Sequence, residues 1–113
     1  MDKYVAIECR LAEALGYKNI CVKMSAGVQT ISTIVDGKFV ELPKWARDNA
    51  AAFELMVEHE VALEYYGDQV CAVLVDMQSI HGICICKYEN YPDKQAAIRF
   101  AIISAVIDKL EAK

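Results

Sequence analysis

The stretch VCAVLVDMQSIHGICIC, residues 70–86, contains two strongly apolar segments separated by a short polar one. The apolar segments, within residues 69–76 and 82–88, have the β-branched and sulfur-containing residues of strands but do not alternate polar with apolar positions. A strand with one face in water normally alternates, whereas a strand covered on both faces is apolar throughout. This stretch therefore predicts a sheet that helices cover on both sides.

Helical patterns lie on both sides of this stretch. Apolar residues at helical spacing and favourable composition predict three helices, over residues 3–15, 48–59 and 92–110. Each begins with residues suited to a helix N-terminus, which are Asp2, Asp48 and the pair Pro92-Asp93. Three helices are enough to cover both faces of a small sheet.

The other apolar segments complete the predicted fold. Strands are expected over residues 20–24, 28–35, 38–42, 61–66, 69–76 and 82–88. Asp36-Gly37 is the clearest hairpin turn, and further turns are expected at Gly67-Asp68 and over residues 77–81. The sequence thus predicts one α+β domain over residues 1–113, with an antiparallel β-sheet between helical layers, an α-β-α sandwich.

Size, composition and cysteine content favour a protein of the cytoplasm. The 113 residues are 56% hydrophobic, above the usual content of about 45–50%, so a substantial core is expected. The longest uncharged apolar run is far shorter than the ~20 residues of a membrane span, and the N-terminus does not resemble a secretory signal. Five cysteines, an odd number spread over helix and strand, fit reduced core thiols rather than a disulfide framework.

The charge is mildly acidic and unevenly distributed. The formal net charge is −4, and no Lys or Arg occurs between Arg47 and Lys87. Direct nucleic-acid binding is not expected, because no cluster of basic residues is present to neutralise phosphates. The acidic segment can be interpreted in two ways, as a solvated surface or as a docking surface for a basic partner. The second interpretation predicts a partner-binding surface made of Glu54, Glu58, Glu60, Glu64, Tyr65, Tyr66 and Asp68.

Thiols and histidines offer a weaker alternative. Cys84 and Cys86 lie on one face of a predicted strand and, with His81, suggest half of a metal site. If Val75 faces Ile83 across the turn, the third thiol of this sheet points to the opposite side. We interpret these cysteines as small apolar residues that pack in the core, so neither a metal nor a cofactor is expected.

Two other ionisable residues are expected to have structural roles. His59 is expected in solvent at a helix end, with protonation favoured by the carboxylates beside it. Arg99 is expected to pair with an acidic strand residue or with a carboxylate of another subunit. The chain has no nucleophile elbow, phosphate-binding glycine loop or distinctive carboxylate pair, and an enzyme is therefore not expected.

Several segments resemble a family of small phage and prophage proteins, the phage ABA sandwich domain. They are Leu11–Gly16, Pro43–Asp48, Ala51–Leu55 and Tyr91–Ala101, spread over about two-thirds of the chain. The sequence departs from that family in its Asp-Gly hairpin and its cysteine-rich strands. The resemblance implies an α-β-α sandwich encoded by a phage or a mobile element, and it provides no catalytic residues.

These observations together predict a small non-enzymatic accessory protein that acts by protein–protein binding. Its expected partner is a host protein with a basic surface, for example a defence factor that it inhibits, and a homodimer is left open. The alternative is a small-molecule or metal-binding protein that uses His81, Cys84 and Cys86.

Overall fold

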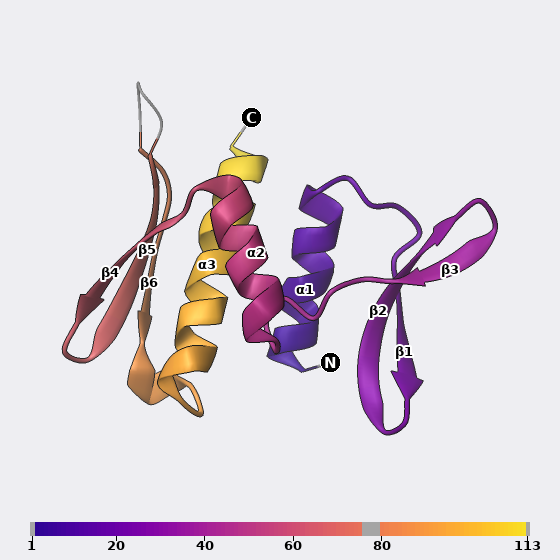
Figure 1. The fold of residues 1–113 in the computed structure, drawn as a ribbon, viewed down its shortest axis with the longest axis horizontal. Helices are drawn as coiled ribbons and strands as arrows, with labels where there is room; N and C mark the ends of the chain where they lie inside the picture. The colour runs from indigo at the N-terminus through magenta and orange to yellow at the C-terminus, as the bar shows by residue number, and fades with distance from the viewer. Residues whose placement is uncertain (1, 76–79, 113) are drawn as a thin grey trace.

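The computed structural model describes residues 2–75 and 80–112, and in this part of the chain helices lie between two small antiparallel sheets (Figure 1). The helices are α1 (Lys3–Ala14), α2 (Asn49–His59), α3 (Lys94–Glu111) and a short 3-10 helix, η1 (Tyr88–Asn90). The strands are β1 (Cys21–Ser25), β2 (Val28–Val35), β3 (Lys38–Glu41), β4 (Ala62–Tyr66), β5 (Gln69–Val75) and β6 (Ile80–Lys87). The α+β class and the antiparallel pairing are confirmed.

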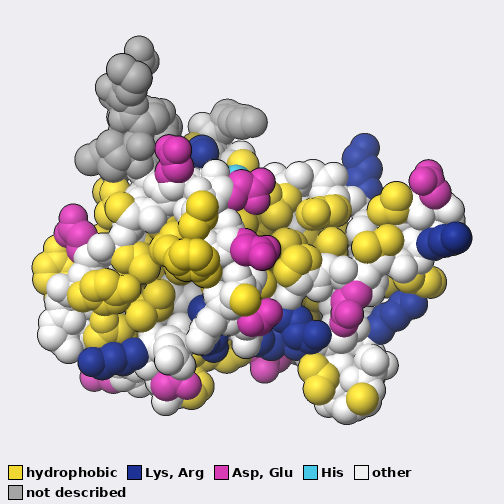
Figure 2. Space-filling model, viewed as in Figure 1, with side chains coloured by type: hydrophobic (Ala, Val, Ile, Leu, Met, Phe, Trp, Pro, Cys, Tyr) yellow, Lys and Arg dark blue, Asp and Glu magenta, His cyan; other side chains and the backbone are white. Residues whose placement is uncertain are grey.

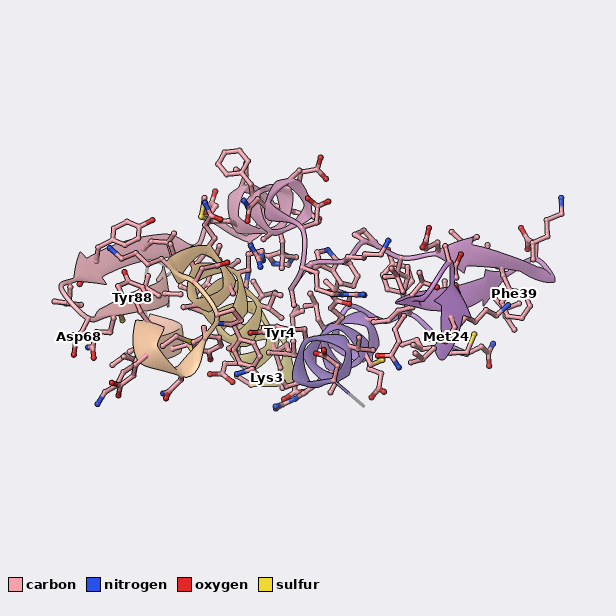
Figure 3. All side chains as sticks on the ribbon, turned by 90° about the horizontal axis from the view of Figure 1, so that it is seen from below. Lys3, Tyr4, Met24, Phe39, Asp68 and Tyr88 are labelled. Carbon is pink, nitrogen blue, oxygen red and sulfur yellow. The ribbon has the colours of Figure 1, made fainter. Side chains whose placement is uncertain are left out.

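The two sheets occupy opposite ends of an elongated molecule of 43 × 33 × 21 Å. The first sheet has the order β1-β2-β3 and the second the order β4-β5-β6. Seen from below, Met24 and Phe39 of the first sheet lie at one end, while Asp68 and Tyr88 lie at the other (Figure 3). The strands therefore do not form the single sheet that was expected.

Tight two-residue turns join strands within both sheets. Ala26-Gly27 and Asp36-Gly37 have positive φ at both positions, 51° and 80° in the first turn and 52° and 77° in the second. Positive φ at both positions is typical of the type I′ turn, whose twist matches that of antiparallel strands. The predicted hairpin at Asp36-Gly37 is confirmed, and so is the turn at Gly67-Asp68 between β4 and β5.

The register of β5 and β6 differs from the expected one. Val75 pairs with Ile80 and Ala72 pairs with Cys84, whereas the expected register had Ile83 opposite Val75. The difference arises because β6 begins at Ile80, two residues earlier than expected, and because the ladder is irregular beyond Ala72.

The predicted turn over residues 77–81 falls largely outside the described residues. Ile80 and His81 belong to β6, and residues 76–79 are among those that the structure does not describe.

An aspartate caps the N-terminus of each α-helix. The capping carboxylates are those of Asp2, Asp48 and Asp93, which accept hydrogen bonds from the backbone N–H groups of Tyr4, Ala50 and Ala96. The first two caps are as predicted. Helix α3 begins at Lys94, so Pro92 precedes the cap and is not the first helical residue, because the carboxylate of Asp93 takes the capping position.

Helix α3 is the centre of the core. It packs against β5 and β6 on one side and against α1 and α2 on the other. Val70, Ala72 and Cys86 of the second sheet are buried beneath it. The opposite face of this sheet is not covered, because Ile83 and Ile85 are 54% and 57% exposed. The expectation of a second helical layer over these strands is therefore wrong, since Ile83 and Ile85 of the outer face lie in solvent.

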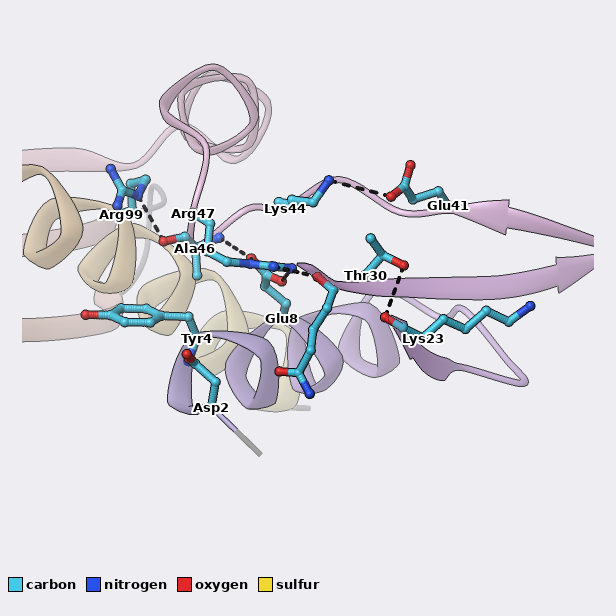
Figure 4. Close-up of polar contacts among 11 residues, drawn as sticks. Asp2, Tyr4, Glu8, Lys23, Thr30, Glu41, Lys44, Ala46, Arg47 and Arg99 are labelled. Carbon is cyan, nitrogen blue, oxygen red and sulfur yellow. Dashed lines mark hydrogen bonds and ion pairs between the residues drawn. The ribbon is translucent and has the colours of Figure 1, made fainter. Parts of the chain in front are cut away.

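A buried ion pair fixes the segment between β3 and α2 (Figure 4). The carboxylate of Glu8 on α1 is fully buried and accepts hydrogen bonds from Nη2 of Arg47 at 2.6 Å and from Nε at 3.2 Å. It also accepts one from the N–H of Ala46, at 2.9 Å. Arg47 donates in addition to the carbonyl of Gln29 on β2, at 2.6 Å. These bonds tie the first sheet to α1.

Arg99 on α3 also forms hydrogen bonds with this segment. Its Nε donates to the carbonyl of Ala46 at 2.9 Å, and its Nη1 donates to Oδ1 of Asn49 at 2.6 Å. The partners of Arg99 are therefore a backbone carbonyl and a side-chain amide, not the strand carboxylate that was expected. The expected pairing with a strand carboxylate is wrong, because Ala46 and Asn49 occupy the guanidinium. The alternative, pairing with a carboxylate of another subunit, stays a prediction.

Candidate functional site

The residues predicted to form one acidic surface point in different directions. Glu54 and Glu58 are exposed on α2, four residues apart and therefore on one side of the helix. Glu60 lies just beyond its C-terminus, in the left-handed conformation with φ of 57°. Asp68 lies in the β4–β5 turn.

The strand residues of the predicted set are divided between two faces of β4. Glu64 and Tyr66 lie on the outer face of the second sheet, where the Tyr66 hydroxyl donates to Oε2 of Glu64 at 2.8 Å. Tyr65 lies on the opposite face, because side chains alternate along a strand. Only part of the predicted set can therefore contact one partner surface.

An apolar groove runs between α2, β4 and α3. It has a volume of about 380 Å³. Its apolar lining comes from Ala52, Phe53, Met56, Leu63, Tyr65, Ile98 and Ile102. Its polar lining comes from Asn49, Gln95 and Arg99. The groove is therefore mainly apolar, with hydrogen-bonding groups from the N-terminal parts of α2 and α3.

Large apolar side chains stand exposed beside this groove. Phe53, Val57 and Tyr65 are 59%, 58% and 61% exposed. Figure 2 shows hydrophobic side chains gathered over α2 and β4, with acidic side chains nearby on the same face of the molecule. Exposed apolar patches of this kind are typical of interaction sites.

A second hollow lies on the other side of α2. It has a volume of about 320 Å³, and its lining includes Glu54 and Glu58 together with Tyr17 and Trp45. The ridge formed by Phe53 and Val57 therefore has the apolar groove on one side and two carboxylates on the other. This surface, defined by Phe53, Glu54, Val57, Glu58 and Tyr65, is called the α2 surface below.

His59, at the end of α2, lies in a different environment from the expected one. It is half-buried, and its Nε2 is buried without a hydrogen-bond partner among the described residues. Burial lowers the pKa of His59, and Lys109 lowers it further, against a smaller opposing effect of Glu58. The expectation of favoured protonation is wrong, because burial outweighs the neighbouring carboxylate.

Two of the three cysteines of the second sheet have sulfur atoms that lie close together. Cys84 and Cys86 lie on the face of β6 that packs against α3, with their Sγ atoms 3.9 Å apart. The Tyr91 hydroxyl donates to Sγ of Cys86, at 3.4 Å. Cys71 pairs with Ile85 and lies on the opposite face, which agrees with the expectation for the third thiol.

The proximity of the two sulfurs makes their acidities unequal. The hydrogen bond with Cys84 lowers the pKa of Cys86 to about 7, and Tyr91 and Lys3 act in the same direction against burial. The same hydrogen bond, together with burial, raises the pKa of Cys84. The pair therefore holds one thiolate more readily than two isolated buried thiols would.

The described residues offer no complete site for a metal of high coordination number. Within residues 2–75 and 80–112, no group of three or more His, Cys, Asp and Glu side chains could hold a metal ion. The position of the His81 side chain, part of the alternative metal set, lies outside what the structure describes.

Among the helices of the described segments, none has both the length and the hydropathy needed to cross a membrane.

Compared with protein-family models, with curated proteins and with solved structures, the chain matches none. The resemblance to the phage ABA sandwich domain therefore stays a prediction.

Proposed function

We propose that this protein acts by binding another protein through the α2 surface. The observation that carries the proposal is the apolar ridge of Phe53 and Val57, exposed between a groove and a pair of carboxylates. Aromatic side chains at the centre of such a surface are the residues that contribute most to protein–protein affinity.

The chemistry of the surface specifies the kind of partner. An apolar side chain of the partner would fill the groove and contact Phe53 and Tyr65, both of which lose exposed apolar area when covered. Lys or Arg side chains beside it would face Glu54 and Glu58, where opposite charges favour association and the correct orientation. The partner is thus a protein with an apolar anchor flanked by basic residues.

The resemblance to phage proteins makes a host protein the first partner to test. A basic surface is common where proteins contact nucleic acid, so covering such a surface would block that contact. Inhibition of a host defence factor is the specific form of the proposal.

The test is affinity capture from host lysate with three variants, followed by measurement of binding to the purified partner. Phe53→Ala should weaken binding at least about tenfold, since central aromatic residues contribute about 2 kcal/mol or more. Reversal of both charges, in Glu54→Lys/Glu58→Lys, should chiefly slow association and reduce its dependence on salt.

The matched control reverses two acidic residues that lie elsewhere. Glu64→Lys/Asp68→Lys has the same change of net charge, but Glu64 lies on the outer face of β4 and Asp68 in a turn. This control should bind as the unmodified protein does. Equal loss in both charge-reversal variants would indicate attraction by net charge alone, and unchanged binding of Phe53→Ala would contradict the proposal.

A further inference from the structure

We propose that Cys84 and Cys86 form a two-thiolate site for one soft metal ion of the Cu(I) class. Both side chains lie on one face of β6 because residues two apart along a strand point the same way. Their sulfurs are 3.9 Å apart. A bond between a metal ion and a thiolate sulfur is about 2.3 Å long. One ion can therefore reach both sulfurs with only small side-chain rotations.

The number of ligands favours a soft ion of low coordination number. Structural zinc needs four ligands, and the described residues contain no group of three or more candidate ligands. Cu(I) accepts two thiolates as a complete set, and thiolates are the soft ligands that it prefers. Cys71 cannot supply a third thiolate, because it lies on the other face of the sheet.

The surroundings can compensate the charge of the bound complex. Two thiols and one Cu⁺ give a bis-thiolate complex with one negative charge and two released protons, without any change of oxidation state. A buried negative charge is stable only where hydrogen bonds or a cation offset it. The Tyr91 hydroxyl donates to Cys86, and Nζ of Lys3 lies 4.2 Å from the centroid of the Tyr91 ring.

Burial favours a site that holds an ion away from water. Cys86 is buried and Cys84 is half-buried, so an ion would enter from the side of Cys84. Helix α3 covers this face of β6, and Phe100 of that helix packs against Tyr91 with ring centroids 5.4 Å apart. A site covered by a helix in this way slows both loss of the ion and its oxidation.

The test is anaerobic titration of the reduced protein with Cu(I) in the presence of a coloured competing chelator. We expect one Cu(I) per chain. Cys84→Ser and Cys86→Ser should each weaken binding more than about 100-fold, since even changes beyond the first ligand shell cost about 10–100-fold. Cys71→Ser, from the opposite face of the same sheet, should bind normally. Tyr91→Phe should bind about tenfold more weakly.

A second measurement needs no variant and so does not depend on how the variants fold. Cu(I) should protect the half-buried Cys84 of the native protein from alkylation, while Cys9 and Cys21 react as they do without the ion. Peptide mass spectrometry identifies the labelled residues. The proposal is wrong if the chelator retains all the Cu(I), or if Cys84 is alkylated equally fast with and without it.

Discussion

At the scale of single residues, the described part of the chain contains two Arg–Glu pairs that differ in burial. Arg47 pairs with Glu8, which is fully buried, whereas Arg10 pairs with Glu111 in solvent, with Nη2 to Oε1 of 2.7 Å. Loss of one partner of a buried pair leaves an uncompensated charge, which costs about 3–5 kcal/mol. An exposed pair contributes about 0–1 kcal/mol.

We therefore expect Arg47→Met to lower the free energy of unfolding by about 3 kcal/mol or more. Arg10→Met should lower it by less than about 1 kcal/mol. Denaturation in urea measures both, and the double variant Glu8→Leu/Arg47→Met should recover part of the loss because no buried charge remains. Equal effects of Arg47→Met and Arg10→Met would contradict the assigned burial.

His59 should make stability depend on pH. Burial lowers its pKa in the folded state below the value of 6.5 for an exposed histidine, so the unfolded chain binds a proton more readily. Its contribution to stability is complete above pH 6.5 and is lost as the pH falls through the folded pKa. Urea denaturation at pH 7.5 and at lower pH should show this loss.

The matched variant for this prediction is Lys109→Gln. Lys109 also lowers the pKa of His59, so its removal should raise the pKa toward 6.5, as followed by NMR titration of the imidazole. His59→Gln should remove the histidine's share of the pH dependence. A pKa of His59 above 6.5 in the folded protein would contradict the prediction.

At the scale of elements, the β2–β3 hairpin depends on the conformation of Gly37. Its φ is +77°, a conformation that residues with a side chain rarely adopt. An added Cβ would meet nothing within 4 Å, so a substitution there loses stability through backbone strain and not through a steric clash. Gly37→Ala should therefore destabilise the protein by about 1–2 kcal/mol in urea denaturation.

Gly67 in the β4–β5 turn provides the control. It has equally open space and is not among the described residues with positive φ. Gly67→Ala should be neutral or stabilise by about 0.4–1 kcal/mol. A similar loss for both substitutions would show that space, and not φ, sets the cost.

Local signals explain which elements could be predicted from the sequence. The Asp36-Gly37 hairpin and the caps at Asp2 and Asp48 depend on neighbouring residues only, and all three are confirmed. The division of the strands into two sheets depends on pairing between distant segments. The sequence contains no local signal that distinguishes two small sheets from one larger sheet.

The buried ion pair was missed for a related reason. Arg47 and Glu8 are far apart in sequence, so their contact is not a local feature. A signal was nevertheless present, because Glu8 lies at helical spacing from Val5 and Ala12, both buried. A carboxylate within such an apolar stripe predicts a buried partner. The α2 surface could be predicted only in part, since the acidity of Glu54 and Glu58 is visible in the sequence but the groove beside them depends on α3 and β4.

At the scale of the whole molecule, the second sheet presents an uncovered apolar face. Ile83 and Ile85 are exposed on β6, which is an edge strand of that sheet. Uncovered apolar faces and free strand edges both favour association between molecules. We expect the purified protein to self-associate as its concentration rises, as measured by sedimentation.

The variant Ile83→Thr/Ile85→Thr should remain monomeric over the same range, because Thr keeps the β-propensity while it reduces the apolar area. Val57→Thr, on α2, is the control and should associate as the unmodified protein does. A monomer at every concentration, or equal association of the threonine variant, would contradict the prediction.

One residue, Ala46, connects the two ends of the molecule through its backbone. The N–H of Ala46 is held by Glu8 on α1, and its carbonyl is held by Arg99, which also lines the apolar groove. A carboxylate introduced into the groove by a ligand would compete for this guanidinium and release the carbonyl. Faster amide hydrogen exchange in β2, at the far end of the protein, would then report that the groove is occupied.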